Sequence, residues 1–387
     1  MSLAPRKKPA RRDVVIVTTP PAADAAVQAA APSPPSVAAY DVISAVQALG
    51  FAVKPLFPDA SVHAPMIAAA TAPAAQNPEL AAIEREQRRY YVAHVETDAQ
   101  AQQIVEQLTS APGVSNVYVK PAVGCPLAPP CAKPTAPAVV PDYSVQQGYL
   151  DAAPAGIGAR NFAWTLPDGK GDNVRFIDIE GGWTVDHVEL RGTGCLIGGQ
   201  PFTDADWTNH GTAALGVLRA ADNSFGVMGI APEASFNAIS HQGLGSAGAI
   251  DLASCSLQAG DITLLEMHRP GPRFGLQSRD DQQGYIAVEW WPDDFLAVRR
   301  AVLRGVIVVE AAGNGAQDLD DFLHDTPDPS FPETWANSFK GAAPVKVRNL
   351  LRASGSPQTT SLAGGIGQRI GNRPDLAAPI PAITPSV

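Results

Sequence analysis

The sequence predicts an α/β fold in which a parallel β-sheet is covered by helices on both faces and is preceded by a small α+β unit. Across residues 142–340, short β-branched runs alternate with helical patterns, which is typical of a parallel sheet. Residues 38–122 hold a shorter mixture of helical and strand patterns. A Pro-rich linker over 123–141 divides the two parts and is an accessible target for cleavage.

In the small unit, apolar residues before Gly50 fall on one helical face, and Gly50 suits the end of that helix. Asp98 can cap a second helix. Residues 1–37 and 59–83 are rich in Ala and Pro and predict flexible or loop structure, apart from the apolar run Val14–Val17. The expected strands of this unit are 51–53, 90–95 and 114–119.

In the large part, we expect strands over 174–177 and 306–309 because both runs are apolar and β-branched or aromatic. One helix is expected to begin near His210. A second spans the apolar positions between Phe295 and Val302, with basic residues in its last turns and Gly305 after it. Residues 341–387 differ in character, because they contain no aromatic residue and one acid, Asp375.

The composition excludes several classes of protein. The 387 residues carry 28 Lys and Arg against 38 Asp and Glu, so a formal net charge of −10 argues against nucleic-acid binding. No apolar window is long enough for a membrane span. The basic N-terminus is followed only by Val14–Val17, which is too short for the apolar region of a secretory signal. The four cysteines leave disulfide pairing open: Cys125 and Cys131 are placed to close a small loop, and four free thiols are an equally good interpretation.

Asp178 follows the apolar strand pattern of 174–177. Catalytic groups gather beyond the carboxyl ends of parallel strands, and a carboxylate there can hold an imidazole in one tautomer. An acid that caps a loop is the alternative interpretation.

His210 lies in Asn209-His210-Gly211-Thr212, where small residues leave room above the ring. A histidine in this position can act as general base, although a histidine taken alone is more often structural. The competing residues His187 and His241 lack comparable surroundings.

Asn314 stands between two glycines, directly after the strand pattern of 306–309. Its amide can donate to a developing oxyanion in acyl transfer. An ordinary turn Asn is the alternative, since Asn beside Gly is common in turns.

Together, these three residues and their order resemble the subtilisin-like serine peptidases over about residues 142–335. The segment from Phe176 to Gly181 resembles the aspartate motif of that family, with one residue more than its common Asp-Ser/Thr-Gly form. Asn209–Thr212, followed by Gly226–Pro232, resembles the histidine motif. Val308–Asn314 resembles the segment that carries the oxyanion-hole Asn.

The resemblance implies a subtilisin-like fold and a serine endopeptidase that acts by acyl transfer on polypeptides and requires no cofactor. In this mechanism Asp178 orients His210, His210 is the base, and Asn314 donates to the oxyanion. Residues 38–122 resemble the inhibitory propeptide of the family, a small ferredoxin-like domain. The chain is then a zymogen whose own propeptide region is an intramolecular inhibitor, with cleavage expected in 123–141.

The nucleophile of the family lies in a Gly-Thr-Ser-like motif downstream of the oxyanion Asn. After Asn314, none of the serines follows Gly-Thr, although Arg373–Pro379 resembles the segment that precedes the nucleophile. We expect either truncation after that segment or a frameshifted or diverged tail over 341–387. The alternative function is a catalytically dead pseudopeptidase or binding protein, because Asp, His and Asn alone cannot form an acyl-enzyme.

Three further features carry weaker interpretations. The acidic cluster Asp318, Asp320 and Asp321 suits either a structural calcium ion or a solvated loop, and the loop is favoured. Trp290 and Trp291 are expected at the edge of the core, rather than as the lining of a pocket. Glu266 follows an apolar run and is expected near the substrate cleft.

Overall fold

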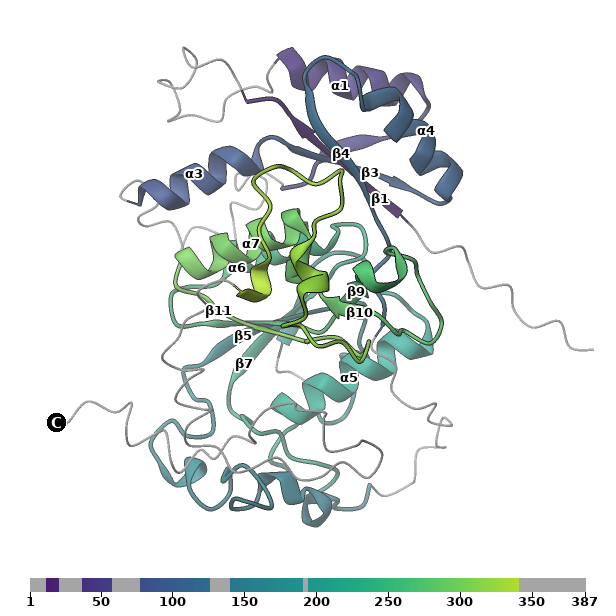
Figure 1. Ribbon diagram of the computed structural model, residues 1–387. Coiled ribbons are helices and arrows are strands. Elements are labelled where there is room, and N and C mark those ends of the chain that lie inside the picture. Colours follow the sequence, from purple (N-terminus) through teal and green to yellow (C-terminus); the bar gives the residue numbers. More distant parts are fainter. Residues whose placement is uncertain (1–11, 21–36, 58–76, 126–139, 191–193, 341–387) are drawn as a thin grey trace, which may run out of the picture.

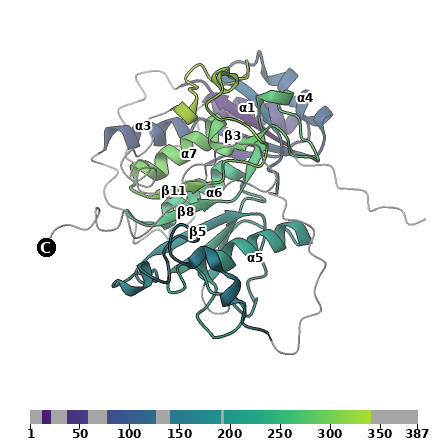
Figure 2. The ribbon, with the colours of Figure 1, turned by 60° about the horizontal axis from the view of Figure 1, so that its bottom comes forward.

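The computed structural model describes residues 12–20, 37–57, 77–125, 140–190 and 194–340. Two β-sheets are stacked with helices between them and helices on their outer faces (Figure 1). A view turned by 60° shows the same order of layers (Figure 2). The predicted fold class, a parallel sheet flanked by helices with a small mixed unit before it, is confirmed.

The N-terminal unit is a four-stranded antiparallel sheet with the strand order β2-β3-β1-β4. Helices α1 and α4 cover its outer face and enclose a core with Val14, Ile16 and Tyr91. Its elements are β1 (Arg12–Thr18), α1 (Val37–Ala48), β2 (Val53–Pro55), α3 (Pro78–Gln87), β3 (Tyr90–Val95), α4 (Asp98–Leu108) and β4 (Val114–Lys120).

Two elements of this unit differ from the sequence prediction. β1 is an inner strand between β3 and β4, although residues 1–37 were expected to be flexible around a short apolar run. Its side chains alternate between two cores, so all four residues Val14–Val17 are buried. Within the loop expected over 59–83, Asn77 caps α3, which has Pro78 in its first turn.

The large unit contains a five-stranded parallel sheet with the order β11-β8-β5-β7-β6. Helices α6 and α7 lie on the face toward the N-terminal unit, and α5 covers the opposite face (Figure 1). Its helices and strands are β5 (Arg175–Glu180), β6 (Gly194–Gly198), α5 (Ala205–Arg219), β7 (Ser235–Ser240), α6 (Ser246–Ser256), β8 (Ile262–Leu265), β9 (His268–Pro270), β10 (Tyr285–Ala287), α7 (Pro292–Leu303) and β11 (Ile307–Glu310). Short 3₁₀ helices are η4 (Ser144–Gln146), η5 (Gly148–Leu150), η6 (Ala163–Thr165), η7 (Pro272–Phe274), η8 (Val288–Trp290), η9 (Phe322–Asp325) and η10 (Ser338–Lys340).

Two boundaries change the setting of the predicted site. β5 continues to Glu180, so that Asp178 lies inside the strand instead of beyond its end. α5 begins at Ala205, and His210 therefore lies in its second turn and not at its N-terminus.

One hydrophobic core joins the two units. It includes Val15 and Tyr118 from the N-terminal sheet together with Ile250 of α6 and Trp290 and Phe331 of the large unit. The rings of Tyr118 and Trp290 both contact Phe331, with ring centroids 5.2 Å apart in each pair. The two sheets therefore pack on one shared hydrophobic core and are not separate domains joined only by a linker.

Among the described helices, none is long and apolar enough to cross a membrane. The predicted tail over 341–387 and most of the predicted linker, 126–139, lie outside the described residues. Cys131 lies there as well, so its predicted pairing with Cys125 stays a prediction.

Candidate active site

Strand β5 presents two carboxyl groups on one face of the parallel sheet. Side chains alternate along a strand, and Ile177 and Ile179 point into the core beneath α6 and α7. Phe176 belongs to the core on the other side, beneath α5. Asp178 and Glu180 share that second face, and both are fully buried.

The two carboxyl groups have different partners. An oxygen of Glu180, Oε1, forms a short contact with Nδ1 of His210. Asp178 instead accepts a hydrogen bond from the indole N–H of Trp183, at 2.7 Å. The structure therefore differs from the prediction that Asp178 is the partner of His210. Glu180, which has the longer side chain and ends β5, contacts the imidazole instead.

Helix α5 is held in place by contacts at both ends of the His210 turn. Asp204 caps the helix by accepting the backbone N–H of Trp207, at 3.1 Å. The hydroxyl of Thr212 accepts the backbone N–H of Thr184, at 2.8 Å. At Gly211, a Cβ would come within 2.7 Å of the Trp183 ring, so only glycine permits this approach. The Gly after His210 thus brings the helix against the loop that follows β5.

The site lies where the strand order of the sheet changes direction. From β5, the chain proceeds to β6 and β7 on one side, and then crosses to β8 and β11 on the other. Open α/β sheets bind ligands at the carboxyl ends of strands beside such a point. Glu180 ends β5, and Glu266 directly follows β8 and donates its backbone N–H to Ile179, at 3.2 Å.

Burial sets the electrostatics of this acidic site. It raises the pKa of Glu180 to about 9, with the charge of Glu266 adding to the effect. It also raises the pKa values of Asp178 and Glu266. The pKa of His210 is lowered by burial, against the opposing charges of Glu266 and Asp178. Glu266 therefore lies within electrostatic range of His210, and its expected place near a substrate cleft stays a prediction.

Asn314 is connected to the site through His268 of β9. The backbone N–H of Asn314 donates to Nδ1 of His268, at 3.1 Å. Burial, followed by the charge of His210, lowers the pKa of His268 to about 4, so the two imidazoles are within electrostatic range. Gly313 has a φ of +95°, which places Asn314 beyond the sharp turn expected from its flanking glycines.

The segment after β4 runs from the N-terminal sheet to this site. Gly124 forms an antiparallel bridge with His268, and its N–H donates to the carbonyl of that residue, at 3.0 Å. The carbonyl of Cys125 accepts from Gln282, at 2.6 Å. Burial raises the pKa of the Cys125 thiol to about 12, with Glu180 and Asp206 adding negative charge. The chain thus enters the acidic site by adding an extended segment to β9.

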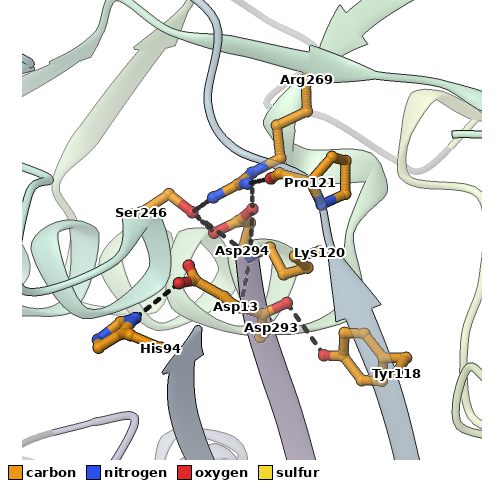
Figure 3. Close-up of polar contacts among 9 residues, drawn as sticks. All are labelled: Asp13, His94, Tyr118, Lys120, Pro121, Ser246, Arg269, Asp293 and Asp294. Carbon is orange, nitrogen blue, oxygen red and sulfur yellow. Dashed lines mark hydrogen bonds and ion pairs between the residues drawn. The ribbon is translucent and has the colours of Figure 1, made fainter. Parts of the chain in front are cut away.

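A buried polar cluster joins β4 to the ends of α6 and α7 (Figure 3). Lys120 donates to Asp293 and Asp294 of α7, at 2.6 and 2.8 Å. Arg269 donates to Ser246, at 2.8 Å, and to the carbonyl of Pro121. Tyr118 donates to Asp293 at 3.0 Å, and Ser246 to Asp294 at 2.5 Å. Opposite charges and hydrogen bonds compensate for the loss of water around these groups.

The remaining predicted residues have other surroundings. The ring of His187 is exposed, and its Nδ1 accepts the backbone N–H of Glu189, at 3.3 Å. His241 is buried, and its ring meets Trp207 edge to face, 5.1 Å between centroids. Trp290 and Trp291 lie fully buried inside the core and not at its edge, where the sequence predicted them, because Phe331 packs against both rings.

The acidic cluster of 318–321 forms local turns. Asp318 accepts the backbone N–H of Asp320, and Asp321 that of Leu323. Within the described ranges, no group of three or more His, Cys, Asp or Glu side chains is arranged to hold a metal ion. Structural calcium therefore stays a prediction, for which this loop offers no preformed ligand set.

Comparison with known proteins gives the site its context. Subtilisin BL from Lederbergia lenta is 31% identical over 187 residues, covering 47% of this chain and 58% of that protein. The major intracellular serine protease of Bacillus subtilis is 28% identical over 160 residues, 38% of this chain and 44% of that protein. About half of the chain is homologous to the subtilisin-like serine proteases. The chain spans about half the length of the curated relatives it matches.

Among solved structures, fervidolysin from Fervidobacterium pennivorans, described as a keratinolytic enzyme related to subtilisin, matches with a TM-score of 0.41. The sequence identity is 15%, over 81% of this chain and 41% of that chain. No family model matches the sequence.

Two of the serines downstream of Asn314, Ser330 and Ser338, lie in the described residues. Neither follows the Gly-Thr pair of the subtilisin-like Gly-Thr-Ser pattern. Ser330 donates its hydroxyl to Asp328. The hydroxyl of Ser338, in η10, is buried. The serines of 354–386 and the Arg373–Pro379 segment lie outside the described residues.

Three features of this site were not predicted from the sequence: the contact of Glu180 with His210, the place of His268, and the bridge that Gly124 forms with it. Glu180 had a detectable signal, because Asp-Ile-Glu places two acids on one strand face, with the second at the carboxyl end. His268 and Gly124 had none, since their pairing joins residues 144 positions apart.

Proposed function

We propose that this protein is a subtilisin-like serine endopeptidase in zymogen form, with polypeptides as substrates. His210 is the general base, and the segment of Asn314 contributes to the oxyanion site. The observation that carries the proposal is the pairing of His210 with a buried carboxyl group at the strand crossover point of the sheet. The homology to serine proteases supports it.

The mechanism that follows is acyl transfer. A serine hydroxyl attacks the scissile carbonyl as Nε2 of His210 takes its proton, and the resulting imidazolium returns that proton to the leaving amine. The oxyanion that forms at the carbonyl is stabilised by N–H donors. Water then repeats the sequence and releases the acyl group, which restores the serine.

The zymogen part of the proposal rests on residues 121–125. Their bridge to His268 is the way an extended peptide adds to an exposed strand edge. Glu180 lies close enough to Cys125 to act on the pKa of its thiol. We infer that residues 121–125 of the N-terminal unit lie where a substrate peptide would bind. The hydrophobic core that the two units share keeps this segment in place.

The alternative is a catalytically inactive pseudopeptidase that binds polypeptides. One observation favours it: after Asn314, no serine in the sequence follows Gly-Thr. The two functions share the site around His210 and differ in the nucleophile alone.

A fluorophosphonate probe separates the two functions. We expect covalent labelling of one serine in the full chain, lost in His210→Ala and retained in His187→Ala, whose ring is exposed. A folded protein that takes up no label supports the pseudopeptidase. Labelling that survives in His210→Ala removes His210 from the mechanism.

The inhibitory role has its own experiment. In Gly124→Leu, the new side chain would collide with Tyr285 and His268, since a Cβ alone would lie 2.7 and 2.9 Å from them. We expect the rate of fluorophosphonate labelling to rise at least tenfold. Gly216→Ala, at a position with open space, is the control. An unchanged rate in Gly124→Leu contradicts inhibition by this segment.

A further inference from the structure

We propose that Glu180, and not Asp178, is the residue that fixes the tautomer and orientation of His210. The inference rests on the proposed function, because it assigns a role in proton transfer by His210. Glu180 is then a positioning residue, which acts on the reaction through the imidazole.

The geometry assigns the role to Glu180 on two grounds. Its Oε1 contacts Nδ1 of His210, and its side chain is fully buried at the last position of β5. A carboxylate that accepts the Nδ1–H leaves the lone pair of Nε2 available to take a proton. The contact is also shielded from water, so it holds the ring in one orientation.

Asp178 has a different hydrogen-bond partner, Trp183. It lies two residues earlier on the same face, and two strand residues span roughly 6.6 Å, so one imidazole nitrogen cannot serve both acids equally. Its Oδ2 accepts from Trp183, and the ring of Trp183 packs on Gly211. Asp178 therefore positions the loop on which α5 rests, one step removed from the imidazole.

The proton balance is complete with Glu180 in this role. When Nε2 takes a proton from a hydroxyl, His210 becomes an imidazolium whose Nδ1–H remains bonded to the Glu180 carboxylate. No proton passes to Glu180, and the imidazolium later gives up the proton that it gained. The carboxylate contributes by stabilising the positive charge.

The neighbouring groups set the pH at which this arrangement exists. Asp178 on the same strand and Glu266 at the end of β8 interact electrostatically with Glu180. His268 of β9 is within electrostatic range of His210, and Asp204 and Asp206 at the start of α5 act together with Glu180 on the thiol of Cys125. Burial and Glu266 hold the pKa of Glu180 at about 9, so its carboxylate form accumulates on the alkaline side. Below that pH, protonation of Glu180 removes the acceptor for the Nδ1–H, so the proposed arrangement is that of the alkaline carboxylate form.

The test is NMR spectroscopy of the full chain with ¹⁵N-labelled histidine, in which His210→Gln assigns the His210 signals. At pH 10 we expect an Nδ1–H resonance for His210, with loss of the alkaline step of its titration in Glu180→Gln. Asp178→Asn, the matched control on the same strand face, should retain that step. Loss of the step in Asp178→Asn, with retention in Glu180→Gln, overturns the proposal.

A measurement on the unaltered protein covers the case in which Glu180→Gln does not fold. With ¹³C-labelled glutamate, the carboxyl of Glu180 should titrate in an alkaline step, and the ring nitrogens of His210 should shift in the same step because the two groups are in contact. An alkaline step of Glu180 that leaves the His210 resonances unchanged overturns the proposal. Neither experiment needs turnover, so absence of fluorophosphonate labelling would count against the peptidase and leave this inference intact.

Discussion

At the scale of single residues, charged side chains are paired with partners that lie far away in the sequence. Asp13 on β1 and His94 on β3 are register partners, and their side chains meet at 2.6 Å. Burial opposes the charge on Asp13, but the hydrogen bond to His94 and the charges of His94, Arg269 and Lys120 lower its pKa to about 2. Asp13 is therefore an ion of the folded state down to strongly acidic pH.

Asp13→Asn tests this pairing through the pH dependence of stability. A pKa lowered from 3.8 to about 2 contributes about 2 kcal/mol at neutral pH, present above pH 4 and lost as the pH falls toward 2. We expect the variant to be less stable than the parent by this amount at pH 7 in urea unfolding. The difference should close below pH 2. Asp222→Asn, in an exposed pair with Lys170, should cost less than 1 kcal/mol at any pH.

At the scale of elements, helix α5 offers two glycines with opposite surroundings. A Cβ at Gly211 would come within 2.3 Å of the backbone carbonyl oxygen of Gly182 and within 2.7 Å of the Trp183 ring, whereas none of the described atoms lies within 4 Å of a Cβ at Gly216. The first position is a packing constraint, and the second carries the usual entropic cost of glycine in a helix.

We therefore expect Gly211→Ala to destabilise the protein by about 1–3 kcal/mol through overpacking. Gly216→Ala should stabilise it by up to about 1 kcal/mol, because alanine has the higher helix propensity. Thermal unfolding measures both. Equal effects of the two substitutions would show that Trp183 does not restrict the approach of α5.

The elements also show which parts of the fold could be predicted. β3 and β4 were predicted nearly to the residue, since their alternation and the turn at Gly113 are local patterns. For β5, the sequence predicted the apolar run 174–177 with Asp178 at its end, whereas the strand continues to Glu180. The buried carboxyl groups of Asp178 and Glu180, at the end of this strand, are hydrogen-bonded to Trp183 and His210. These partners come from tertiary packing, which no local sequence pattern reveals.

The same limit applies to the site. The order of Asp178, His210 and Asn314 pointed to residues that the structure brings near one another, directly or through His268, because motif spacing is a property of the sequence. The choice between Asp178 and Glu180 depends on where α5 lies along β5. The position of α5 along β5 results from the close packing of Gly211 against Trp183. This packing is a tertiary contact and cannot be predicted from the local sequence.

At the scale of the whole molecule, the cluster of Lys120, Asp293 and Asp294 connects the two units. Lys120 is 1% exposed and bonded to both carboxylates. Removing one partner of a buried ion pair leaves an uncompensated charge, which costs about 3–5 kcal/mol. The N-terminal unit therefore stabilises acids that belong to the large unit.

Lys120→Met should lower the free energy of unfolding by about 3–5 kcal/mol, measured in urea at pH 7. Lys170→Met, which removes an exposed lysine at 3.1 Å from Asp222, should cost less than about 1 kcal/mol. Similar losses in the two variants would mean that the cluster of Figure 3 contributes no more than a surface pair.

The position of β1 in the middle of the antiparallel sheet has a consequence for the order of events during synthesis on the ribosome. β1 pairs with β3 and β4, so all four strands of this sheet are available once Lys120 has emerged. At that moment none of the parallel sheet has been translated. Since domains fold as they emerge, the first sheet can be complete beforehand and offer Val15, Tyr118 and Lys120 as a template on which α6 and α7 settle.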